Sequence, residues 1–436
     1  MHDVLDMREM LRDEIIQLRE SGHVLDDLAT SAGAIDAASD VEVRGRLAEL
    51  EAAPMAAGWP YHEPSQLEAI EGEQPAAPEP AQLSLDESAL HGRILGAWLG
   101  RCAGCMLGKP VESWQRSQIR EYLQHRRAYP IRDYLPPAEP GPHDHPPLHP
   151  SWAETTLGRI GGVARDDDID YTILALHILD TYGPGFTTAD VATEWLRRFP
   201  FAQLYTAERA AYRNLILGLR PPATAVHVNP YREWIGAQIR ADAFGYVSPG
   251  DPAHAARLAY KDARLSHTAN GIFGAMWSAA LVAASFAERS MGDALRSALA
   301  AVPARSRLAE ALRGVADLRA RDLDWEAARD AIEERHGALS PVHTINNAAV
   351  VAAALLWGEG DFTRTIGLAV QGGWDTDCNG ATAGSAFGAM HGVHALPAHW
   401  TAPLEDRIRT ALFGFDGARP SALAERTLRV ALRPMG

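Results

Sequence analysis

The stretch that decides the fold is HGRILGAWLG, residues 91–100. Its apolar and small residues recur at helical spacing, and the same kind of pattern returns in DYTILALHILDTYG (170–183), GIFGAMWSAALVAASFAE (271–288) and HTINNAAVVAAALLWG (343–358). Alternating apolar and polar runs between turn residues, which would indicate strands, are scarce. The sequence therefore predicts an all-α fold from about residue 89 onward.

The first 86 residues differ in composition from this helical part. Residues 1–30 predict an amphipathic helix, and residues 31–86 are rich in Ala, Glu and Pro, ending in EGEQPAAPEPAQLS. We expect a helical extension and linker over 1–86, with packing favoured over partner binding, and one helical domain over 87–436. The Pro-rich segment 125–160 predicts a long loop, either a lid or a disordered insertion.

Composition excludes several classes of function. The chain has 436 residues, 47% hydrophobic and 22% charged, with a formal net charge of −15. This acidity argues against nucleic-acid or anionic-membrane partners, and no apolar run reaches the ~18–20 residues of a membrane span. Its three cysteines (Cys102, Cys105 and Cys378) cannot form a closed disulfide framework. With no signal-peptide pattern at the N-terminus, we expect a soluble, cytoplasmic protein.

One acidic cluster, Asp166-Asp167-Asp168, follows a Gly-rich loop and precedes an apolar helical pattern. Carboxylates at a helix start can cap its free N–H groups and interact favourably with its dipole. A single Asp is enough for capping, however, and three adjacent like charges repel one another unless a cation neutralises them. The excess charge indicates a metal site.

A second acidic cluster lies in GGWDTDCNG, residues 372–380, where Asp375 and Asp377 again follow a glycine turn. Side chains two residues apart in an extended turn point to the same side. Oxygen ligands suit Mg²⁺, Mn²⁺ or Ca²⁺ better than zinc. After this turn, small residues at 381, 384, 385 and 388 form a helical stripe that allows another helix to approach closely.

Three blocks together resemble the ADP-ribosylglycohydrolase family: GAWLGRCAGCMLGKPVE (96–112), DDDIDYT (166–172) and GGWDTDC (372–378). Two weaker blocks, GAQIRAD (236–242) and LSHT (265–268), are also similar to segments of that family. The order and approximate separations agree over about residues 90–434. The resemblance implies a compact all-α fold with a central dinuclear site for two Mg²⁺ ions, Mn²⁺ being the alternative.

The resemblance also implies roles for the acidic residues. Asp167, Asp168, Asp375 and Asp377 match the family's metal ligands, and Asp166, which stands where the family has Thr, adds a fifth carboxylate. Glu112 matches a glutamate near the metals that acts in catalysis or gates substrate entry. We take Glu112, Asp168 and Asp375 as candidate catalytic residues. Cys378 replaces a hydroxyl ligand, and a thiol is a poor Mg²⁺ ligand.

Four further residues are candidates for substrate contact. An indole at Trp374 would stack on a base or pack on a sugar face. Arg240 and Asp242 either line the cleft, which we favour slightly, or pair with each other. For His267, a capping or core role and a substrate contact are equally open.

For other polar residues, a structural role is favoured over a role in binding. For the loop histidines His143, His145 and His149, a solvated loop is favoured over metal binding. For Asn346 and Asn347, helix capping is favoured over substrate contact.

The resemblance implies hydrolysis of an ADP-ribosyl or related ribosyl linkage on a small molecule or a protein. The ribose diol would bind the metals and an activated water would attack. One alternative is hydrolysis of a small N- or O-riboside, because Lys and Arg are scarce near the motifs. Another is a non-catalytic, crystallin-like member of the same family.

Overall fold

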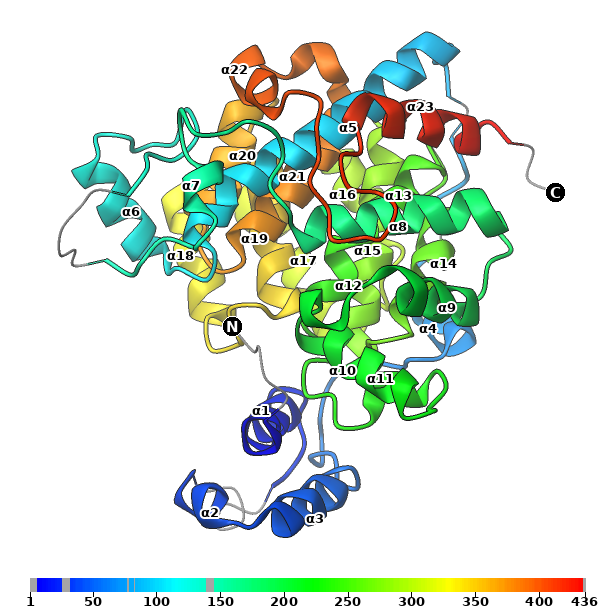
Figure 1. Ribbon diagram of the computed structural model, residues 1–436. Coiled ribbons are helices and arrows are strands. Elements are labelled where there is room, and N and C mark those ends of the chain that lie inside the picture. The colour runs from blue at the N-terminus through cyan, green and yellow to red at the C-terminus, as the bar shows by residue number, and fades with distance from the viewer. Residues whose placement is uncertain (1–5, 26–31, 77, 82, 139–144, 434–436) are drawn as a thin grey trace.

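The computed structural model describes residues 6–25, 32–76, 78–81, 83–138 and 145–433 (Figure 1). Over these residues the chain is helical, and its β-structure is confined to isolated bridges. The all-α prediction is confirmed, and each of the four quoted patterns is helical over most of its length. The α-helices are α1 (Met7–Glu20), α2 (Ala32–Ala37), α3 (Asp40–Leu50), α4 (Leu67–Glu73), α5 (Glu87–Gly108), α6 (Arg116–His125), α7 (Trp152–Thr155), α8 (Asp167–Tyr182), α9 (Thr188–Arg198), α10 (Thr206–Ile216), α11 (Ala223–Val226), α12 (Gly236–Ile239), α13 (Asp242–Tyr246), α14 (Pro252–Ala263), α15 (Ala269–Ser285), α16 (Met291–Leu299), α17 (Arg307–Ala320), α18 (Trp325–His336), α19 (Thr344–Trp357), α20 (Phe362–Gln371), α21 (Thr376–His391), α22 (Ala398–Thr401) and α23 (Pro420–Ala431). Four 3₁₀ turns complete the set: η1 (Lys109–Val111), η2 (Phe201–Gln203), η3 (Val393–Ala395) and η4 (Ala402–Leu404).

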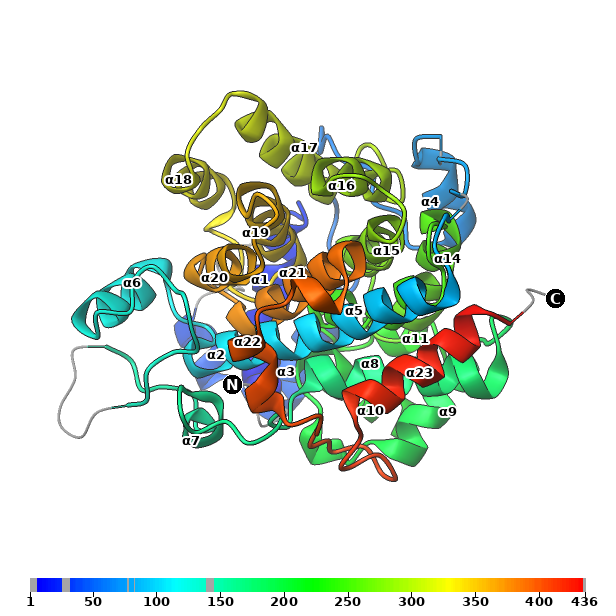
Figure 2. The ribbon, with the colours of Figure 1, turned by 90° about the horizontal axis from the view of Figure 1, so that it is seen from above.

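Helices α5 and α21 pack against each other in the middle of the molecule (Figure 2). Their contact is made by glycines four residues apart in each helix, which face one another in antiparallel order: Gly96, Gly100, Gly104 and Gly108 on α5, and Gly380, Gly384 and Gly388 on α21. A Cβ atom at any of these positions would come closer than 3.0 Å to backbone atoms of the other helix. Glycine is therefore required for this approach. The antiparallel order brings the end of α5 beside the start of α21.

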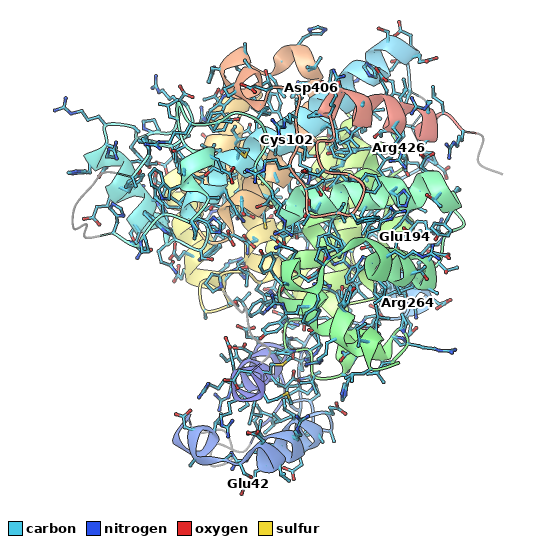
Figure 3. The ribbon with its side chains drawn as sticks, viewed as in Figure 1. Glu42, Cys102, Glu194, Arg264, Asp406 and Arg426 are labelled. Carbon is cyan, nitrogen blue, oxygen red and sulfur yellow. The ribbon has the colours of Figure 1, made fainter. Side chains whose placement is uncertain are left out.

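The start of α8 is attached to this helix pair by a buried arginine. Arg101, on the same helix as Cys102 (Figure 3), donates to the carbonyl of Asp168 at 2.7 Å and to its Oδ1 at 3.1 Å. Its other terminal nitrogen donates to Asp242 Oδ2 at 2.8 Å. Three helix termini, of α5, α8 and α21, therefore meet at one place.

The N-terminal extension has a small hydrophobic cluster of its own, formed by Leu11, Ile15, Ile35, Ala38, Val43 and Leu47. Figure 3 places Glu42 of α3 at the end of the extension farthest from the main body. Helix α1 is joined to the main body by an ion pair between Glu14 and Arg232, at 2.7 Å. The single helix expected over 1–30 is wrong in its extent, because α1 ends at Glu20 and the chain then turns; residues 1–5 and 26–31 lie outside the described part.

The Pro-rich segment is irregular over its described residues, as expected, apart from the short helix α7. It is fixed to the domain where it can be followed, since the Tyr122 hydroxyl donates to the Pro136 carbonyl at 2.7 Å. The amide of His149 donates to the Pro110 carbonyl at 2.9 Å. His143 lies outside the described residues. None of the described helices is long and apolar enough to span a membrane.

Candidate metal centre

The two acidic clusters, about 210 residues apart in sequence, converge in space. Cys378 Sγ lies 3.1 Å from Asp168 Oδ2. Three sets of side chains have ligand atoms within 4.8 Å of one another: Asp168, Asp377 and Cys378; Glu112, Asp375 and Asp377; and Asp166, Asp167 and Asp168. The structure therefore gathers all five predicted Asp ligands and Glu112 in one group, hereafter the carboxylate cluster.

Helix capping accounts for one member of this cluster. Asp166 occupies the N-cap of α8 and accepts a hydrogen bond from the Asp168 amide at 2.9 Å. Asp375 is the N-cap residue of α21, yet its side chain accepts no capping bond. Because one Asp is enough to cap a helix, the other carboxylates have no such structural reason to be there.

A lysine ammonium lies within the cluster. Lys109 Nζ is 2.7 Å from Asp166 Oδ2, 2.8 Å from Glu112 Oε2 and 2.9 Å from Asp377 Oδ2. These oxygens belong to three different segments of the chain. Arg101 and Lys109 belong to the first block of the resemblance, but the otherwise apolar pattern of that block did not indicate that either lies at the centre of the site.

Burial and mutual repulsion perturb the acidity of the cluster. Burial, followed by the charge of Asp166, raises the pKa of Asp167 to about 6. Burial, followed by the charge of Asp377, raises the pKa of Glu112 to about 7, although Lys109 opposes this. The pKa of Asp375 lies well above its usual range because the side chain is buried and lies beside the charges of Asp377 and Glu112. Two carboxyl groups in contact must share a proton or a cation.

Asp166 is the exception among these acids. Burial would raise its pKa, but the neighbouring Lys109 ammonium, helped by Arg165, holds it below the usual value. This carboxylate is therefore charged throughout the neutral range.

The turn that carries Asp375 is held by backbone contacts. The Trp374 carbonyl accepts from the Ser113 amide at 2.9 Å, and the Trp374 amide donates to the Trp114 carbonyl at 3.0 Å. Trp374 has a φ of +69°, which is strained for a bulky residue. Arg329 lies over its ring, 4.0 Å from the centroid. The indole, 2% exposed, thus packs against a cation inside the protein, and its peptide ties the Asp375 turn to the segment that follows Glu112.

The other residues predicted to contact the substrate are buried and paired with groups of the protein. Arg240 is buried, forms ion pairs with Glu208 and Asp262, and does not pair with Asp242. Asp242 pairs instead with Arg101. His267 is also buried, and its Nδ1 lies 2.8 Å from Ser266 Oγ. All three side chains are held by contacts within the protein, which favours a positioning role for each, and His267 Nε2 is a buried nitrogen without a hydrogen-bond partner among the described residues.

Two residues for which a purely structural role was favoured lie close to the carboxylate cluster. His149 Nε2 is 3.9 Å from Glu112 Oε2, and the side chain is 19% exposed rather than fully solvated. Asn347 does not cap α19, because His343 does so. Its Oδ1 instead accepts from the Asp375 amide at 3.2 Å and from Asn379 Nδ2 at 2.8 Å. Burial of Asn347 within an apolar helix was the signal that would have identified it.

The charge balance fits a divalent cation. Six carboxyl groups face Lys109, Arg101 and Arg165, and two of these bases also pair with other acids, Arg101 with Asp242 and Arg165 with Asp170. Asp377 Oδ1 is buried and has no hydrogen-bond partner among the described residues. Buried carboxylates need a counter-charge, and hard oxygen donors in this number suit Mg²⁺ or Mn²⁺.

We expect the thermal stabilisation by Mg²⁺ to increase between about pH 5 and about pH 7.5, because the ligands must lose their protons to bind the ion. Asp167 and Glu112 ionise at higher pH in the folded than in the unfolded chain. Without cation, the free energy of unfolding therefore falls over the same interval. Melting curves across this range, with and without Mg²⁺, measure both trends. Equal stabilisation at both ends would contradict this account of the site.

Comparisons with known proteins bear on the family and on the fold. The sequence model of the ADP-ribosylglycohydrolase family matches residues 86–432. A solved structure described as an ADP-ribosylglycohydrolase-related protein complex is similar, with a TM-score of 0.50 and 21% identity. The similarity covers 79% of this chain and 99% of that chain, and at this identity it concerns the fold. A search of curated proteins gave no match.

Proposed function

Because this chain belongs to the ADP-ribosylglycohydrolase family, we propose that it is a cation-dependent glycosidase that cleaves an ADP-ribosyl or related ribosyl linkage. The observation that carries the proposal is the convergence of the two Asp clusters and Glu112, which capping does not explain. We assign as ligands of Mg²⁺ or Mn²⁺ the five aspartates of the cluster, Asp166, Asp167, Asp168, Asp375 and Asp377. The resemblance implies two ions, which we take as the largest number that the cluster binds.

The protein's own groups would divide the work at this site. A divalent cation, when bound, would coordinate the ribose diol and lower the pKa of a bound water. Cleavage of a glycosidic bond builds positive charge on the sugar ring, which a nearby carboxylate stabilises. Glu112, with its side chain 24% exposed and its pKa near 7, is placed to do this and to exchange a proton at neutral pH. Asp168 and Asp375 are more deeply buried, and they would hold the cation in a fixed position relative to Glu112.

We assign substrate contact to the partly exposed side of the cluster. Asp167, Glu112 and His149 retain some solvent exposure, whereas Trp374, Arg240, Asp242 and His267 are buried. For these four we propose a positioning role, in place of direct contact. Arg240 anchors the segment after α12, and Asp242 holds Arg101 against Asp168.

A small N- or O-riboside is the second candidate substrate. The basic groups nearest the cluster are already paired: Lys109 with three carboxylates and Arg165 with Asp170 at 2.9 Å. A pyrophosphate would therefore have to recruit a cation from elsewhere. The non-catalytic alternative is disfavoured, because a structural protein would gain nothing from buried carboxylates that repel one another.

We also propose that residues 1–86 are an extension to a catalytic domain formed by residues 87–436. Most buried apolar residues of α1 to α3 form a cluster of their own, which supports this division, whereas Met10 clusters with Trp234 and Ile70 belongs to the main core. The family match, which begins at residue 86, agrees with it.

The proposed function is tested by incubating the protein with ADP-ribosyl-arginine and ADP-ribosyl-serine peptides, O-acetyl-ADP-ribose and simple nucleosides. Each reaction is run with Mg²⁺, with Mn²⁺ and with EDTA, and products are separated by chromatography. We expect a cation-dependent ribosyl product from at least one substrate. Release from nucleosides alone would favour the small riboside, and no cation-dependent product from any of them would overturn the proposal.

A further inference from the structure

Lysine is nearly absent from this protein. Of its 41 basic residues, two are lysines, Lys109 and Lys261, and the rest are arginines. Lys261 lies at the periphery of the domain, where its Nζ donates to the Pro184 carbonyl at 2.8 Å. Lys109 is the one at the carboxylate cluster. A chain that uses arginine almost everywhere else has a compact ammonium at this position.

The ammonium of Lys109 is surrounded by carboxylate oxygens. It has three N–H donors, and three carboxylate oxygens lie 2.7–2.9 Å away: Asp377 Oδ2 accepts a hydrogen bond, and the other two form ion pairs with it. One oxygen comes from Glu112 after η1, one from Asp166 before α8 and one from Asp377 in α21. The flat, forked guanidinium of arginine presents its donors in one plane and would not serve three oxygens arranged around a point. The three carboxylates thus bind Lys109 as they would a small cation.

Charge remains after Lys109 is counted. A carboxylate oxygen of Asp375 lies within 4.8 Å of one of Asp377, and Asp377 Oδ1 has no hydrogen-bond partner among the described residues. Among the described residues, no Lys or Arg side chain forms an ion pair with Asp167. Asp168 and Asp242 both form ion pairs with Arg101. These oxygens form a set distinct from those that contact the ammonium. They leave ligands for one divalent ion. Asp166, whose two oxygens cap α8 and contact Lys109, becomes a metal ligand only when Lys109 is neutralised.

We propose that Lys109 is a built-in cation that occupies one of the two cation positions of the centre, so that this chain binds one divalent ion. The inference rests on the proposed function, because it takes the carboxylate cluster as a cation site. Neutralising Lys109 would open the second position. The same oxygens of Asp166, Glu112 and Asp377 would then be free to bind a second ion.

The test is the number of Mn²⁺ ions bound per full-length chain, measured by titration calorimetry and by electron paramagnetic resonance. We expect one ion for the wild-type protein, two for Lys109→Met, and one for the matched control Lys261→Met. The Lys109 variant should also show the spectral signature of two coupled Mn²⁺ ions. Its melting temperature without metal should be lower than that of the wild type, and its rise on adding Mn²⁺ should be larger.

Each other outcome has a defined meaning. Two ions in the wild-type protein, or one ion in a folded Lys109→Met protein, would overturn the inference while leaving the cation site intact. No Mn²⁺ in either protein would instead overturn the cation site and the proposed function with it. Lys109→Gln, which keeps a polar side chain of similar reach, is measured in the same way in case the methionine variant does not fold.

Discussion

Replacing Asp375 with Asn is expected to abolish cation-dependent hydrolysis and, at the same time, to stabilise the metal-free protein. The substitution keeps the shape of the side chain and removes one negative charge from the cluster. Even changes to outer partners of a metal site cost about 10–100-fold in affinity or activity, so we expect loss of a ligand to lower Mg²⁺ affinity by at least about 100-fold.

The gain in stability has a separate cause. Asp375 is 4% exposed and in contact with Asp377, and its pKa is raised well above the usual range. Folding without a cation therefore requires this carboxyl either to keep its proton or to be repelled by its neighbour. An amide removes that cost, so the melting temperature without metal should rise. A purely structural carboxylate would give the opposite sign.

Calorimetric titration with Mg²⁺ and melting curves in EDTA measure the two effects. Asp180→Asn is the matched control, because Asp180 lies at the other end of α8 and pairs with Arg426 and Arg433. That variant should keep the wild-type Mg²⁺ affinity. If Asp375→Asn bound Mg²⁺ as tightly as the wild type, Asp375 would not be a ligand.

Much of the fold was predictable from the sequence, because helical periodicity is a local property. The small residues after Asp377 indicated close approach of another helix, and the structure confirms this with Gly384 and Gly388 against α5. The partner helix was not identified from the sequence, although α5 carries the same four-residue glycine spacing. Pairing depends on which two stripes meet, and that is decided by the whole chain.

The convergence of the acidic residues was predictable because excess negative charge at a helix start is conspicuous in a sequence. The residues that hold them were not. Arg101 and Asn347 lie within apolar helical patterns and act through contacts with Asp168 and Asp375, which sequence spacing does not reveal. For Trp374, the role expected from the sequence differs from the one that its surroundings in the structure favour. Its position beside Asp375 suggested a ligand contact, but its backbone conformation turns the indole toward Arg329.

The largest loss of stability is expected from Gly104→Ala, a change of one methyl group. The added Cβ would overlap the carbonyl group of Gly380 on α21, which is backbone and cannot rotate away. Overpacking in a core costs about 1–3 kcal/mol and occasionally more. Because the two helices would have to separate along their length, we expect the free energy of unfolding to fall by at least about 3 kcal/mol.

The same substitution elsewhere on α5 should act in the opposite direction. Beyond its own helix backbone and chain neighbours, Gly92 has no atom within 4 Å of the position of an added Cβ, and alanine within a helix is favoured over glycine by about 1 kcal/mol. Gly92→Ala should therefore be neutral or stabilising in denaturant titrations. Gly104→Ala should also weaken Mg²⁺ binding, since separating the helices moves Lys109 and Glu112 away from Asp377. Equal stability of the two variants would show that the glycines are not what sets the distance between α5 and α21, and that another contact brings the cluster together.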